Sequence, residues 1–154
     1  MKKQFVFLMI SLIFFCACQS STSEKESDQA GLDSNLAPTA QQNCYAYIKG
    51  KDTATLTLLT SGMVSTGELH YKWFEKDNNS GTIAGEMHGD TLIASYTFNA
   101  EGKQSSRQVV FLKRGDQLLE GFGEVTEKEG KVIFKDVSKL NFGQALVFEQ
   151  VACK

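Results

Sequence analysis

The 154-residue chain has one proline, two histidines and one tryptophan, and it has no apolar run of membrane-spanning length. Its longest apolar stretch, residues 5–17, holds 13 residues interrupted only by Ser11, whereas a membrane-spanning helix needs about 20. His70 and His88 are the only histidines, and no further ligands stand at the spacing of a zinc site. A formal net charge of −2 without a basic patch argues against nucleic acid as a partner. We therefore expect no metal, no cofactor and no nucleic-acid partner.

Residues that could perform catalysis are also scarce. Glu68, Glu86 and Glu120 each stand next to a glycine within a run of strand-like sequence. Alternating polar residues of an antiparallel sheet normally face water, so we expect these carboxylates to be solvated. The sequence therefore predicts that the protein is not an enzyme.

The N-terminus has the organisation of an export signal. Two lysines precede the apolar stretch, which ends in the small residue Ala17 followed by Cys18 and a polar segment. This junction resembles the lipobox of bacterial lipoprotein signal peptides. The resemblance implies that residues 1–17 are a signal peptide, that Cys18 receives the lipid and that the anchored chain does not span the membrane. Gln19 after the cysteine, in the same family's pattern, implies the outer membrane, facing the periplasm or the cell surface.

The segment that follows, residues 18–43, is polar and contains the only proline, Pro38. It has no aromatic residue and few aliphatic ones, so it cannot bury enough apolar surface to fold alone. We interpret it as the lipidated cysteine followed by a disordered tether. Residues 44–154 are long enough for one hydrophobic core, and we expect them to form one domain.

The periodicity of this domain is that of β-strands. In residues 67–74, Leu69, Tyr71 and Trp73 alternate with polar side chains. Nine such runs lie between turn signals, at about residues 44–50, 53–60, 66–75, 81–88, 91–99, 106–114, 117–125, 131–136 and 145–152. The pattern predicts an all-β fold, a single antiparallel up-and-down meander of about 8–9 strands closed as a small barrel. A β-sandwich is the alternative.

Two glycine-first dipeptides, Gly89-Asp90 and Gly115-Asp116, are expected to form two-residue hairpin turns, because glycine adopts the positive φ that such turns require. The Gly89-Asp90 turn predicts a register in which the apolar side chains of the two strands lie on the same face of the sheet. In that register the facing pairs are Met87 with Leu92, Gly85 with Ala94, and Ile83 with Tyr96.

Cys44 and Cys153 stand at the two ends of the expected domain. An exported protein reaches an oxidising compartment, and the first and last strands of a closed barrel are neighbours. We therefore expect a disulfide between them, with two unpaired thiols as the alternative.

A ligand site, if the barrel has one, is expected among Tyr71, Trp73, Gly85 and Tyr96, where aromatic rings face a position without a side chain. The strand pattern is loosely similar to that of the calycin (lipocalin-like) barrels, which implies a carrier. The function expected first is a lipid-anchored cell-envelope protein that serves as a non-catalytic interaction or structural module. The alternative is a carrier that binds a small apolar molecule. The expected partners are the membrane, through the lipid anchor, and an envelope protein or a small apolar ligand.

Overall fold

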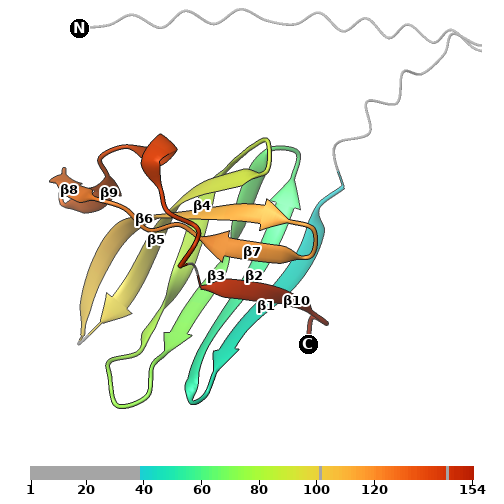
Figure 1. Ribbon diagram of the computed structural model, residues 1–154, viewed down its shortest axis with the longest axis horizontal. Helices are drawn as coiled ribbons and strands as arrows, with labels where there is room; N and C mark the ends of the chain where they lie inside the picture. The colour runs from blue at the N-terminus through green and yellow to red at the C-terminus, as the bar shows by residue number, and fades with distance from the viewer. Residues whose placement is uncertain (1–38, 101, 145) are drawn as a thin grey trace, which may run out of the picture. The chain divides into compact units, whose positions relative to one another are not determined.

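The computed structural model describes residues 39–100, 102–144 and 146–154 (Figure 1). The expected signal peptide, the expected lipidation site Cys18 and most of the expected tether lie outside these residues. The described strands are β1 (Gln41–Lys49), β2 (Asp52–Ser61), β3 (Val64–Lys72), β4 (Asn79–His88), β5 (Thr91–Ala100), β6 (Lys103–Arg114), β7 (Gln117–Glu120), β8 (Val125–Lys128), β9 (Lys131–Phe134) and β10 (Val147–Val151). A 3-10 helix, η1 (Val137–Lys139), precedes β10. No helix of the described residues is long and apolar enough to span a bilayer.

Eight of these strands form a closed barrel. Strands β1 to β6 each pair antiparallel with the next strand in sequence, and β10 pairs antiparallel with both β7 and β1. In Figure 1 the strands run side by side around the molecule, and β10 lies between β7 and β1. The predicted all-β meander closed as a barrel is confirmed.

The hairpin register predicted from the turns is also confirmed. Strands β4 and β5 pair Met87 with Leu92, Gly85 with Ala94, and Ile83 with Tyr96. Gly89 and Gly115, which begin the two turns, have φ values of 61° and 59°. These backbone conformations favour glycine, so the turn residues determine the register and thereby which side chains enter the core.

The expected strand at 117–125 is divided in two. Strand β7 ends at Glu120, and the chain then leaves the barrel to form residues 121–144, which we call the arm and which includes β8, β9 and η1. A Cβ at Gly121 would lie 2.8 Å from the ring of Phe142, so the arm returns close to its own beginning. The arm is attached to the barrel where β9 pairs with β6, at Arg107 and Val132, and where Phe134 N donates a hydrogen bond to Gln108 Oε1 (3.0 Å).

Large apolar side chains fill the barrel. The residues that are at most 2% exposed include Leu56, Leu69, Ile83, Leu92, Tyr96, Phe111 and Phe148. Burying each such side chain contributes about 1.5–3 kcal/mol. The interior is thus a packed core contributed by most strands of the barrel.

The Cys44–Cys153 disulfide links β1 to the residues that follow β10, with the two Cα atoms 5.2 Å apart. The predicted bond is confirmed. It joins the first barrel strand to the end of the last one, and so it covalently closes a loop with a sequence separation of 109.

Candidate functional site

Two charged side chains face the inside of the barrel, Arg107 on β6 and Glu120 at the end of β7. Strand β6 directs Val109 and Phe111 into the core, and Arg107 has the same parity. Glu120 is paired with Phe111 across the β6–β7 hairpin, and its side chain is only 6% exposed. The expectation that Glu120 is solvated is therefore wrong, because the hairpin register turns this carboxylate toward the core.

Glu120 is held by a tyrosine and an arginine. The Tyr71 hydroxyl donates a hydrogen bond to Glu120 Oε1 at 2.9 Å, and Arg107 Nη2 lies 3.9 Å from the same oxygen. The guanidinium carbon of Arg107 lies 5.2 Å from the ring centroid of Tyr71 and 5.5 Å from that of Tyr96. Cations at this distance from aromatic rings are stabilised by the ring quadrupole, so Arg107 is fixed between the carboxylate and the rings.

The electrostatics follow from burial. Loss of solvent raises the pKa of Glu120, while the Arg107 charge and the hydrogen bond from Tyr71 act in the opposite direction. Burial, followed by the charge of Glu120, raises the pKa of Tyr71 well above its usual value. Burial also raises the pKa of Tyr96 to about 12. Both tyrosines therefore keep their hydroxyl protons at neutral pH and act as hydrogen-bond donors.

Two polar atoms of this cluster are left over. Among the described residues, Arg107 Nε and Glu120 Oε2 are buried and have no hydrogen-bond partner. An unmet buried polar atom costs about 1–3 kcal/mol, so most native proteins provide a partner for it. Both atoms are enclosed by the surrounding protein atoms, so they lower the stability of this cluster.

A cavity of about 300 Å³ lies beside Arg107 and Glu120, between β6, the end of β7 and the arm. Its polar lining comes from Arg107, Gln108 and Glu120. The apolar walls are Val109 of the barrel and Phe122, Val125, Val132 and Phe134 of the arm. Small-molecule sites are mostly apolar concavities with a few converging polar groups and a volume of about 300–1,000 Å³, so this cavity meets the description at its lower limit.

Three of the four residues predicted to bind a ligand are brought together. The ring of Tyr71 is stacked on Trp73 with centroids 5.5 Å apart, and it lies edge-on to Tyr96 at 5.9 Å. Gly85 serves a different purpose, because a Cβ there would collide with the backbone of Ile93 and Ala94 on β5. The missing side chain of Gly85 therefore accommodates the neighbouring strand.

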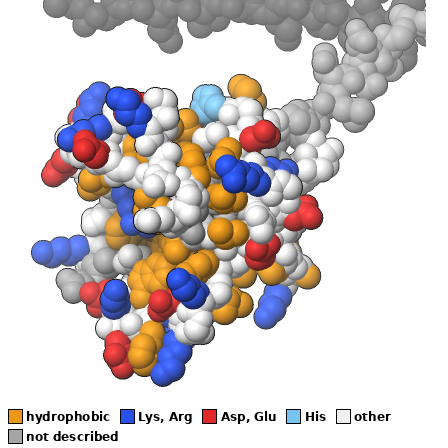
Figure 2. All heavy atoms as spheres, viewed as in Figure 1, with side chains coloured by type: hydrophobic (Ala, Val, Ile, Leu, Met, Phe, Trp, Pro, Cys, Tyr) orange, Lys and Arg blue, Asp and Glu red, His pale blue; other side chains and the backbone are white. Residues whose placement is uncertain are grey.

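The aromatic contacts continue on both sides of this group. Tyr47 lies 6.3 Å from Trp73 and 6.2 Å from Phe148, and Phe98 is stacked on Tyr96 at 4.8 Å. Trp73, Tyr47 and Phe98 are only half-buried. Figure 2 shows one face of the molecule with hydrophobic side chains gathered at its middle and charged side chains mainly toward its edges.

Sequence reasoning missed Arg107 as a site residue and placed Glu120 on the wrong face. The signal that could have found them is the Gly115-Asp116 turn, since a two-residue loop there pairs Arg114 with Gln117 and hence Phe111 with Glu120. Counting back by twos from Phe111 reaches Arg107.

Another polar group lies on the outer surface of β3 and β4. His70 Nδ1 is 2.6 Å from Ser80 Oγ, and His70 Nε2 is 3.5 Å from Glu68 Oε2. The side chains of His70 and Glu68 are 44% and 69% exposed, so this row is a solvated sheet surface. In the part of the chain that the structure describes, no group of three or more His, Cys, Asp or Glu residues could hold a metal ion.

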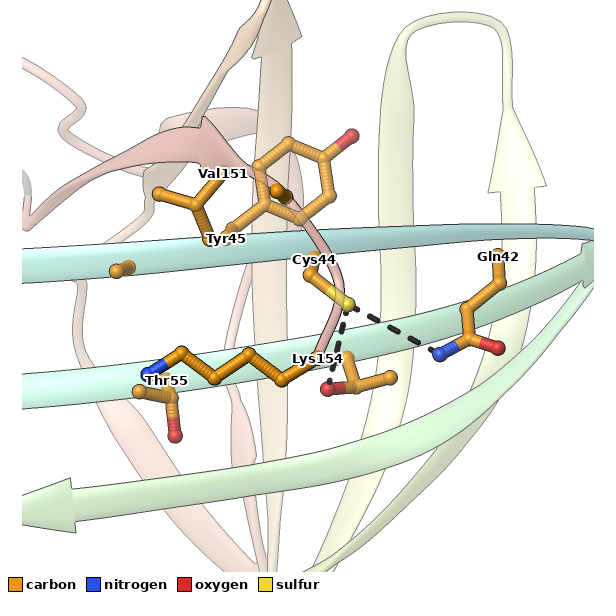
Figure 3. Close-up of a pocket in the computed structure, with 9 residues that line it drawn as sticks. Gln42, Cys44, Tyr45, Thr55, Val151 and Lys154 are labelled. Atoms are coloured by element: carbon orange, nitrogen blue, oxygen red, sulfur yellow. Dashed lines mark hydrogen bonds between the residues drawn. The ribbon is translucent and has the colours of Figure 1, made fainter.

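A cavity of about 400 Å³ lies next to the disulfide, in the region shown in Figure 3. Cys44 is one of its lining residues, and Cys44 Sγ lies 3.8 Å from Thr57 Oγ1 and 4.0 Å from Gln42 Nε2. Gln42, Thr55 and Lys154 contribute polar groups, and all three are exposed. Because exposed groups already bind water, this cavity is a weaker candidate than the one beside Arg107 and Glu120.

Comparison of the sequence and the structure with family models, curated proteins and solved structures finds no match.

Proposed function

We propose that the protein is a non-catalytic binding module of the bacterial cell envelope that takes a small, largely apolar molecule in the cavity beside Arg107 and Glu120. The observation that carries the proposal is that the ion pair of Arg107 and the buried Glu120 lines a cavity whose other walls are mostly apolar. Small-molecule sites combine apolar walls with a few polar groups in this way.

Because side chains fill the core of the barrel, a ligand site at the side of the barrel is favoured over one in its interior. Tyr96 and Phe111 are fully buried in the interior, where a carrier of the lipocalin type would hold its ligand. The arm instead builds the outer wall of the cavity, and the Phe134–Gln108 hydrogen bond keeps that wall against β6.

A binding role without catalysis is supported by the chemistry of the cluster. Burial holds the pKa of Tyr71 well above the neutral range, so its hydroxyl is a poor base and a poor nucleophile. The Ser80–His70–Glu68 row lies on an open surface without the water exclusion that strengthens catalytic electrostatics.

The envelope location rests on the lipobox-like junction at Ala17 and Cys18. A lipid on Cys18 would attach the barrel to the membrane, facing the periplasm or the cell surface. The Cys44–Cys153 disulfide supports an exported protein, because disulfides persist mainly in oxidising compartments.

The proposal is tested by titrating the mature chain, residues 18–154 with Cys18→Ser, with the neutral fluorescent probe N-phenylnaphthylamine. We expect saturable binding of one probe molecule per chain. Val125→Trp should abolish it, because Val125 lines the cavity and is 50% exposed, so an indole can fill the space without disturbing the core.

The matched control is Val151→Trp, since Val151 is similarly exposed at 45% but lines the cavity next to the disulfide. Loss of binding in Val151→Trp alone would move the site to that cavity. Absence of saturable binding would leave the interaction module, without a small ligand, as the better description.

A further inference from the structure

The two charged side chains that line the cavity beside Arg107 and Glu120 are unequally accessible. The side chain of Arg107 is 36% exposed, whereas that of Glu120 is 6% exposed. Glu120 Oε1 accepts the hydrogen bond from Tyr71 and Oε2 is enclosed by protein atoms, so the carboxylate presents no free acceptor to the cavity. Among the described residues that line the cavity, no other carries a charge. A molecule that enters therefore meets the positive charge of Arg107.

The accessible part of this charge is the end of the guanidinium. Nε is enclosed, but within the described part of the chain neither Nη1 nor Nη2 of Arg107 is a buried atom or has a hydrogen-bond partner. Glu120 Oε1 lies 3.9 Å from Nη2, which is too long for a hydrogen bond. The rings of Tyr71 and Tyr96 lie 5.2 Å and 5.5 Å from the guanidinium carbon. The rings thus hold a guanidinium whose terminal N–H groups are free to donate.

Building on the proposed function, we infer that the molecule bound in this cavity is an anionic amphiphile, with a carboxylate at Arg107 and a short apolar body against the arm. The terminal N–H groups of a guanidinium match the two oxygens of a carboxylate, and such charge-assisted hydrogen bonds are stronger than neutral ones. The body lies against Val109, Val125, Val132 and Phe134. At about 30 Å³ for each water-sized unit, the cavity of about 300 Å³ holds about ten non-hydrogen atoms, the size of octanoate.

Glu120 is compatible with a bound anion. Burial raises the pKa of Glu120, while the charge of Arg107 and the hydrogen bond from Tyr71 act in the opposite direction. A carboxylate at Arg107 brings a second negative charge near Glu120, which favours the protonated form of Glu120 further. The carboxyl group can therefore take up a proton when the anion binds, and its like charge is then removed.

The test uses three probes with the same eight-carbon body: octanoate, octanamide and octylammonium. Arg107 and Arg114 are the only arginines of the chain, so a ¹H–¹⁵N spectrum of the mature protein has two arginine Nε–H signals. Arg114 lies at the exposed β6–β7 turn and is an internal control. Octanoate should shift the Arg107 signal saturably without shifting that of Arg114. It should also bind at least about tenfold more tightly than the other two probes.

Variants of the two charged residues sharpen the test. Arg107→Gln removes the cation, so octanoate should then bind no more tightly than octanamide. Arg107→Lys retains the charge without the planar fork and should keep part of the preference for octanoate, which covers the case that Arg107→Gln does not fold. The matched control Arg114→Gln should keep the full preference. Glu120→Gln removes the opposing carboxylate and should bind octanoate at least as tightly as the wild-type protein does.

The outcomes separate the ligand class from the function. If octanamide or octylammonium binds to the wild-type protein at least as tightly as octanoate, and Val125→Trp abolishes this binding, the inferred ligand class is wrong and the binding function stands. An unchanged preference for octanoate in Arg107→Gln, or its loss in Glu120→Gln, would show that Arg107 does not hold the carboxylate. If no probe shifts the Arg107 signal while N-phenylnaphthylamine binds, only the inference is wrong. If N-phenylnaphthylamine also fails to bind, both are wrong.

Discussion

Replacing Arg107 with methionine should make the stability of the barrel fall more steeply as the pH rises. Glu120 would lose the positive charge that lies 3.9 Å from its carboxylate and favours its ionised form. Methionine retains much of the apolar length of arginine, so the packing against Tyr71 and Tyr96 changes less than the charge does.

The direction in which stability changes with pH follows from the pKa of Glu120. Burial raises it in the folded protein, so the folded chain binds this proton more tightly than the unfolded chain does. The resulting stability is fully present below the unfolded pKa and is lost as the pH rises through the folded pKa. Without Arg107 the folded pKa is higher still, and the decline continues further toward alkaline pH.

The size of the stability loss follows from the same coupling between proton binding and folding. Between the folded pKa values of wild-type Glu120 and of Glu120 in Arg107→Met, the penalty of the substitution should grow by about 1.4 kcal/mol for each pH unit. Removing one partner of a fully buried ion pair costs about 3–5 kcal/mol. The Arg107 side chain is 36% exposed, so solvent screens the pair, and we expect the penalty to level off at or below the lower end of that range.

The assay is urea unfolding at about pH 5 and about pH 8, followed by Trp73 fluorescence and circular dichroism. In a Glu120→Gln background the Arg107→Met penalty should be the same at both pH values, because the titrating group is gone. Arg114→Met is the matched control, since Arg114 is exposed at the β6–β7 turn. A penalty in the wild-type background that does not change with pH would refute the coupling between Arg107 and Glu120.

Three further changes address the closure, the packing and the anchor. Replacing both Cys44 and Cys153 with alanine should lower the free energy of unfolding by about 4–5 kcal/mol by the loop-entropy estimate for a separation of 109, and an unchanged urea midpoint would contradict it. Gly85→Ala should cost at least about 1–3 kcal/mol in thermal unfolding, because the added Cβ meets the rigid backbone of β5, and a neutral effect would show that β5 can move away. Cys18→Ala should abolish metabolic labelling with a fatty acid, whereas equal labelling of the variant would exclude Cys18 as the lipidated residue.

The barrel itself was largely predictable because its determinants are local. The period-two pattern identifies the strands, and the Gly89-Asp90 turn fixes the pairing of Ile83 with Tyr96. The division of the run at 117–125 was not predictable in the same way. Strand β7 ends at Glu120 because the arm packs against its own start, with Phe142 next to Gly121, and this contact joins residues that no local pattern relates.

The site residues were predictable from the sequence only where the side chain is apolar and its position in the strand alternation faces the core. Tyr71, Trp73 and Tyr96 follow the alternation, and the structure brings their rings together. Arg107 and Glu120 follow the same alternation, but charged residues are rarely buried unless they are paired, so polarity alone assigns them to the surface. Their partners come from β3 and β5, and the sequence does not show that these side chains meet.

The polar cluster also shows why packing alone does not account for this part of the sequence. The Tyr71 hydroxyl is buried and needs an acceptor, which Glu120 Oε1 supplies, and the buried carboxylate needs a counter-charge, which Arg107 supplies. Each of these contacts satisfies one polar group, yet Arg107 Nε and Glu120 Oε2 remain without hydrogen-bond partners. Apolar side chains of similar volume would fill the same space with equal or greater stability. The cluster is therefore better explained by the proposed binding at the cavity that Arg107 and Glu120 line.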